Sequence, residues 1–165
     1  NGAAMRVSAV GHLASDEAQV LALSDRFSEM THNHPEAMES AQAVALAIFW
    51  AKQGRSMESI MHALTDRYGY NLARTPEEIR PDYVRTERAI DSVPQALSCA
   101  IHAQSFEDAI RNAVSLGGDS DTIAAIAGSI AEAAFGVPRE IEAITLGYLP
   151  EDMQDVVSRF YSRTS

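Results

Sequence analysis

The chain has 165 residues, of which 46% are hydrophobic, and it carries a formal net charge of −10. This length fits one domain of ordinary size, and the apolar content is enough to build a packed core, which argues against wholesale disorder. An acidic surface repels phosphate groups, so nonspecific binding to nucleic acid or to an anionic membrane is disfavoured.

Cysteine content and apolar runs indicate the compartment. The single cysteine, Cys99, excludes an intrachain disulfide and is typical of a reducing compartment. The longest apolar run, residues 43–51, is too short to span a bilayer, and no secretory signal pattern opens the chain. We therefore expect a soluble, cytoplasmic protein with no nucleic-acid and no membrane partner.

Apolar residues recur at helical spacing along almost the whole chain. Ser56 and Ser105 are placed to cap helices, and Gly69 is placed to end one. Residues 70–91 hold two prolines and many charges, so a loop with short helical turns is expected there. No alternating run supports a sheet, so the predicted fold class is all-α. The expected helices cover residues 16–30, 35–53, 56–68, 92–101, 106–114, 119–135, 139–145 and 151–161.

The segment richest in potential metal-ligating side chains is Leu116-Gly117-Gly118-Asp119-Ser120-Asp121-Thr122, at the start of a long predicted helix. Asp119, Asp121 and Thr122 offer three hard oxygen ligands within four residues, as Mg²⁺, Mn²⁺ or Ca²⁺ requires. The alternative is an ordinary helix start, in which Asp119 or Ser120 caps the helix and Asp121 favours its dipole. The spacing alone is compatible with both.

A second polar segment is Thr31-His32-Asn33-His34-Pro35-Glu36, at the entrance to another helix. Two histidines and a carboxylate could form part of a zinc site, although the pattern is weak without a third ligand. The alternative is a polar loop in which Asn33 or His34 caps the helix. Neither a serine-nucleophile elbow nor a phosphate-binding loop occurs, and Cys99 is predicted to be a buried small residue.

Four segments together resemble the ADP-ribosylglycohydrolase family. Residues 117–128, GGDSDTIAAIAG, resemble the signature GGD-[ST]-DT-h-[GA]-A-I-A-G. Residues 1–6, NGAAMR, match G-N-G-x-[AS]-M-R from its asparagine onward, and residues 31–37 resemble [ST]-H-x-[HD]-P-x-A. Residues 92–97 resemble the V-P-x-A-L helix start, and the four segments stand in the order of the family.

The resemblance implies a compact, multi-helix orthogonal bundle that hydrolyses the glycosidic bond between ADP-ribose and a protein side chain or small molecule. It implies that Asp119, Asp121 and Thr122 are ligands of two divalent cations, Mg²⁺ or Mn²⁺. The substrate, ADP-ribose or an ADP-ribosylated molecule, would contact five residues. These are Asn1, Gly2, His32, Gly118 and Ser120.

Two family motifs, G-D-[AS]-x-G and [YF]-[TS]-D-D-[TS], supply further metal ligands and do not occur here. No catalytic residue is assigned for this reason. We expect residues 1–165 to be one all-α domain that forms the C-terminal part of a longer one, or to be completed by an N-terminal segment in trans. The alternatives are a non-catalytic member with a binding or structural role, and a metal-dependent hydrolase of another nucleotide or phosphoester.

Overall fold

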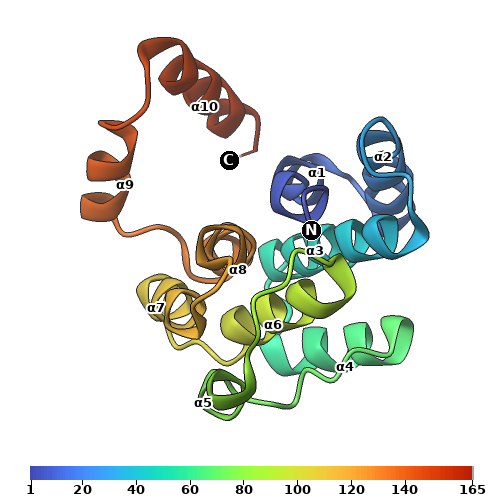
Figure 1. Cartoon of the computed structure of the whole chain (residues 1–165). Helices are drawn as coiled ribbons and strands as arrows, with labels where there is room; N and C mark the ends of the chain where they lie inside the picture. Colours follow the sequence, from blue (N-terminus) through green and yellow to red (C-terminus); the bar gives the residue numbers. More distant parts are fainter. Residues whose placement is uncertain (165) are drawn as a thin grey trace.

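The computed structural model describes residues 1–164, and within this range the chain forms helices and loops without a strand (Figure 1). The all-α prediction is confirmed, and residue 165 lies outside the described residues. The elements are η1 Ala4–Arg6, α1 Ser8–Leu13, α2 Glu17–Glu29, α3 Pro35–Lys52, α4 Met57–Tyr68, α5 Pro76–Ile79, η2 Arg80–Asp82, α6 Ala89–Ile101, α7 Phe106–Leu116, α8 Ser120–Phe135, α9 Arg139–Leu146 and α10 Glu151–Thr164.

Helix α3 forms the centre of the core. All residues from 43 to 51 are buried, on every side of the helix. A helix that is apolar all round must be surrounded by other elements, and α3 contacts α1, α2, α4, α6 and α8. Pro35 occupies its first turn, where the missing N–H costs no hydrogen bond.

Local signals located several helix ends correctly. The Ser56 hydroxyl accepts a hydrogen bond from the Ser59 N–H, and the Ser105 hydroxyl accepts one from the Asp108 N–H. Gly69 ends α4 in the left-handed conformation, with φ of 71°. Each of these residues does what its side chain, or the lack of one, favours.

Two expectations about the helices were wrong. The helix expected from residue 92 begins at Ala89, so Pro94 lies inside α6. The Pro94 ring nitrogen cannot donate to the Ile90 carbonyl, and α6 continues through this lost bond because its Val93, Ala96 and Leu97 side chains are fully buried. Helices η1 and α1, near the start of the chain, were not expected at all.

Helices α9 and α10 form an arm that leaves the end of α8 and returns towards α1 (Figure 1). Neither helix buries any of its residues. The tip of the arm is attached where the Lys52 Nζ donates to the Thr164 carbonyl at 2.8 Å and where the Phe160 ring meets the His12 ring edge-on. None of the helices within residues 1–164 has the length and apolarity needed to cross a membrane.

Candidate functional site

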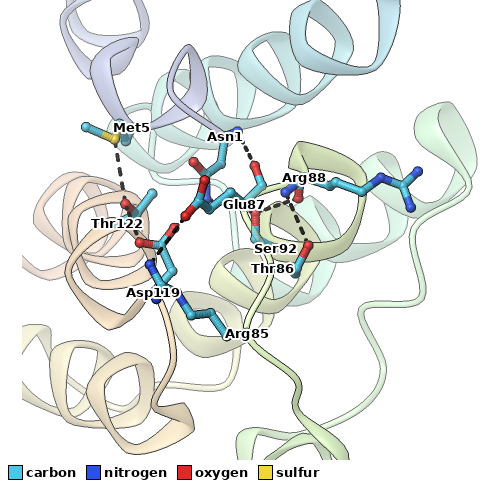
Figure 2. A network of polar contacts seen from close by, with 9 residues as sticks. All are labelled: Asn1, Met5, Arg85, Thr86, Glu87, Arg88, Ser92, Asp119 and Thr122. Carbon is cyan, nitrogen blue, oxygen red and sulfur yellow. Dashed lines mark hydrogen bonds and ion pairs between the residues drawn. The ribbon is translucent and has the colours of Figure 1, made fainter.

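The candidate site lies where the turn before α8 meets the start of the chain. Gly117 and Gly118 both have positive φ, 77° and 66°, and bring Asp119 to the N-cap position of α8. The Asp119 side chain makes no capping hydrogen bond, although the residue occupies the N-cap position. Its carboxylate instead accepts from the Asn1 Nδ2 at 2.7 Å and from the Thr122 Oγ1 at 3.2 Å (Figure 2).

Asn1 connects this turn to the start of α6. Its Nδ2 also donates to the Ser92 Oγ at 3.2 Å, and that hydroxyl donates to the Arg88 carbonyl at 2.8 Å. Its ammonium group donates to the Glu87 carbonyl at 2.9 Å. Figure 2 shows Asn1, Ser92 and Asp119 converging from three segments that are far apart in the sequence.

The other predicted metal ligands differ in exposure. Thr122 is buried at 8% exposure, and its Oγ1 lies 3.7 Å from the Met5 Sδ of η1. Asp121 is exposed on the first turn of α8, where the helix dipole favours a negative charge. Ser120, the first residue of α8, is partly buried.

His32 lies beside Gly2, so the structure brings two of the predicted substrate-binding residues together. A Cβ placed on Gly2 would stand 2.7 Å from the His32 Nε2, so a larger residue at position 2 would require the imidazole to move. The Gly2 carbonyl accepts from the Arg6 Nε at 2.6 Å, and the Arg6 Nη2 lies 3.4 Å from the His32 Nδ1. Burial, followed by the charges of Arg6 and the Asn1 ammonium, lowers the pKa of His32 from its ordinary value of 6.5. These effects favour the neutral imidazole at pH 7.

The second histidine plays no part in this arrangement. His34 occupies the N-cap position of α3 without a side-chain capping bond, so the predicted cap is not formed by its ring. Across residues 1–164, no group of three or more His, Cys, Asp or Glu side chains is arranged to hold a metal ion. The zinc alternative for residues 31–36 therefore has no third ligand in the part of the chain that the structure describes.

Sequence reasoning missed two residues of this region. Ser92 lies inside a segment that was interpreted only as a helix start, yet its hydroxyl bonds Asn1. Tyr83 belongs to the loop after η2, and its ring comes within 2.9 Å of a Cβ placed on Gly118. Ser92 could have been suspected as a buried polar residue in the V-P segment, whereas Tyr83 gave no signal, because it reaches the turn from 35 residues away.

Asp119, Asp121 and Thr122 supply the oxygen ligands that a hard divalent cation prefers, but they supply fewer than it needs. Two carboxylates and one hydroxyl can each supply an oxygen ligand, whereas Mg²⁺ takes about six. The remaining ligands would be water, substrate or groups from another polypeptide segment. The Asp119 carboxylate is already fixed in place by Asn1 and Thr122, as a ligand is by the groups around a metal site.

A family model described as ADP-ribosylglycohydrolase matches residues 1–164. The chain belongs to the ADP-ribosylglycohydrolase family. It is 27% identical over 201 aligned positions to the ADP-ribosylhydrolase ARH3 of Bos taurus, with 93% of the chain covered. It is 30% identical over 118 positions to the ADP-ribosylarginine hydrolase Tri1 of Serratia proteamaculans (strain 568), with 68% of the chain covered.

The solved structures agree on the fold of this ADP-ribosylglycohydrolase chain. It superposes on an "ADP-ribosylglycohydrolase-related protein complex" with a TM-score of 0.72 at 24% identity, over 94% of its own length. The chain covers 57% of that structure, 55% of the bovine ARH3 and 32% of the Serratia Tri1. It therefore spans about half, or less, of the relatives that it matches.

Proposed function

We propose that this chain carries part of the active site of an enzyme that hydrolyses the glycosidic bond between ADP-ribose and a protein side chain or small molecule. The observation that carries the proposal is the hydrogen bond from the Asn1 amide to the Asp119 carboxylate. It joins two segments that both resemble family signatures but lie 118 residues apart. The family match and the names of the relatives, ADP-ribosylhydrolase and ADP-ribosylarginine hydrolase, support this chemistry.

Under this proposal, Asp119, Asp121 and Thr122 supply oxygen ligands to two divalent cations, Mg²⁺ or Mn²⁺. Such cations, when bound, would supply Lewis-acid chemistry for hydrolysis of a glycosidic bond. They also offset the negative charge that a net charge of −10 would present to a diphosphate.

The surrounding groups orient these ligands and bind the substrate. The Asn1 amide and the Thr122 hydroxyl hold the two oxygens of Asp119, so its carboxylate plane is set before any ligand arrives. Gly2 and the neutral His32 lie close together and offer the sugar and the diphosphate hydrogen-bonding groups. Gly118 and Ser120 would let the backbone of the turn approach the same ligand.

No residue of this chain is proposed as the general acid or base. A further polypeptide segment would have to bring carboxylates to the site, as part of the same protein or as a separate chain. A non-catalytic role, in which the fold binds ADP-ribose without cleaving it, is the second candidate. It applies to a protein in which no further segment supplies the remaining metal ligands.

The metal assignment is tested with Asp121→Asn, which removes a ligand charge but keeps the size of the side chain. The matched control is Asp152→Asn, because Asp152 is also an exposed second residue of a helix, α10. We expect Asp121→Asn to weaken Mn²⁺ binding by at least about tenfold, in line with the loss of one ligand. Asp152→Asn should leave it unchanged. Titration calorimetry of both variants decides the point, and equal Mn²⁺ affinity in the two would remove Asp121 from the site.

One assay distinguishes hydrolysis of the ADP-ribosyl bond from binding of ADP-ribose without cleavage. The purified protein is incubated with Mg²⁺ or Mn²⁺ and peptides that carry ADP-ribose on arginine or serine, and release of ADP-ribose is followed by mass spectrometry. Release that depends on the metal supports the hydrolase. ADP-ribose binding without release supports the binding role. If neither occurs, and another nucleotide binds or is cleaved instead, the metal-dependent phosphoester alternative takes their place.

A further inference from the structure

The Gly117–Gly118 turn is not held in place by its own sequence. Both residues have positive φ, and glycine reaches many other conformations at little cost. Asp119 follows directly, and its carboxylate must lie in one place if it is to serve a metal or a substrate. A group outside the turn is therefore needed to keep it in its conformation.

Tyr83 lies against this turn. A Cβ placed on Gly118 would stand 2.9 Å from the Tyr83 Cε1, and 3.1 Å and 3.2 Å from the Arg85 Cβ and Cα. The Tyr83 ring also packs against the buried core of the molecule. The ring thus occupies the space that a side chain at residue 118 would fill, and it joins the turn to the core.

The contact is made by the ring and not by the hydroxyl. The Tyr83 hydroxyl is buried, and it has no hydrogen-bond partner within residues 1–164. Burial raises the pKa of Tyr83, and the nearby Asp119 carboxylate and the Cys99 thiol raise it further, so the side chain stays neutral. Tyr83 therefore contributes no hydrogen bond to the turn, and its ring acts on Gly118 through van der Waals contact.

We propose that Tyr83 is a positioning residue whose ring holds the Gly117–Gly118 turn and so places the Asp119 backbone where the Asn1 and Thr122 hydrogen bonds can orient its carboxylate. The residue acts through Gly118 and touches neither metal nor substrate. Its role in ligand binding rests on the proposed function of Asp119, whereas its role in holding the turn does not.

Backbone order parameters of Gly118 and Asp119, measured by ¹⁵N relaxation on the metal-free protein, test the contact directly. In the wild type they should be about 0.85, as in rigid backbone, and in Tyr83→Leu they should fall below about 0.6. Tyr83→Phe keeps the ring and should keep the wild-type values. The control is Tyr70→Leu, because Tyr70 is another buried tyrosine of the same core, whose hydroxyl contacts Ser40.

Mn²⁺ affinity is measured on the same proteins by titration calorimetry. We expect Tyr83→Leu to weaken Mn²⁺ binding by at least about tenfold, while Tyr83→Phe and Tyr70→Leu stay within about twofold of the wild type. The proposal is overturned if Tyr83→Leu leaves the turn rigid, if Tyr83→Phe loosens it equally, or if Tyr70→Leu does so. If the wild type binds no Mn²⁺, the proposed function fails, and the order parameters still decide the role of Tyr83.

Discussion

Gly54 and Gly118 both adopt a positive φ, 78° and 66°, but only Gly118 has close neighbours. Nothing lies within 4 Å of a Cβ placed on Gly54. At Gly118 the same atom would meet the Tyr83 ring and the backbone of Arg85. A glycine-to-alanine change therefore measures backbone strain alone at one position, and strain plus overpacking at the other.

We predict that Gly54→Ala lowers the free energy of unfolding by about 1–2 kcal/mol, the cost of a left-handed alanine. Gly118→Ala should lower it by about 1–3 kcal/mol more, because a backbone atom cannot move aside as a flexible side chain does. Urea denaturation of the two variants gives the difference. Equal losses in both would mean that the Tyr83 and Arg85 contacts do not restrict residue 118.

Only part of the candidate site could be predicted from single residues. Asp119, Asp121 and Thr122 are neighbours in the sequence, so their grouping followed from spacing, and the resemblance added Asn1 and His32. The hydrogen bond from Asn1 to Ser92 and the contact of Tyr83 with Gly118 depend on how distant segments pack. Spacing along one segment contains no information about such contacts.

At the scale of elements, two helical glycines mark close approaches between helices. In α1, a Cβ on Gly11 would stand 2.7 Å from the Ala45 carbonyl oxygen and 2.7 Å from the Ile48 Cβ of α3. In α8, a Cβ on Gly128 would stand 2.8 Å from the Ile110 Cδ1 of α7. The first neighbours are rigid, whereas the last is the end of a flexible side chain.

Gly11→Ala should therefore destabilise the protein by about 1–3 kcal/mol, because α1 must move away from α3. Gly128→Ala should change the stability by less than about 1 kcal/mol, because Ile110 can change rotamer and alanine favours the helix. Thermal or urea unfolding of both variants checks this ordering. A larger loss at Gly128 than at Gly11 would contradict the explanation from rigid neighbours.

The long helices were predictable, while η1 and α1 were not. A helix of six residues, such as α1, is not stable alone, and it forms here because Val7, Val10 and Gly11 are buried. Its sequence carries no cap and only a short apolar pattern. The early start of α6 was missed for a related reason, since burial of Ala89 and Val93 outweighs the interruption at Pro94.

At the scale of the whole molecule, stability is distributed unevenly. Helix α3 is surrounded on all sides, whereas α9 and α10 bury none of their residues. An open pocket of about 260 Å³ lies between Leu13 of α1 and Val156 and Phe160 of α10. The position of α9 and α10 relative to the other helices could not have been predicted from their amphipathic sequences, because few contacts determine that position.

We expect amide hydrogen exchange to be at least about tenfold faster in α9 and α10 than in α3, because regions with few buried contacts open locally. The end of the arm near Thr164 should be slower than its middle, since the Lys52 Nζ, the His12 ring and the Glu132 carboxylate contact it. Exchange followed by mass spectrometry resolves the helices. Equal protection of α3 and the arm would show that the arm is held by more than these contacts.

The single thiol of the chain is shielded from solvent, in contrast to the exposed helices α9 and α10. Cys99 is fully buried on α6, and burial raises its pKa to about 12. Alkylating reagents attack the thiolate, so Sγ reacts only in molecules whose core has opened far enough to admit solvent and reagent. The rate at which Cys99 is alkylated in an unmodified sample therefore reports how often the core opens. No added label is needed for this measurement.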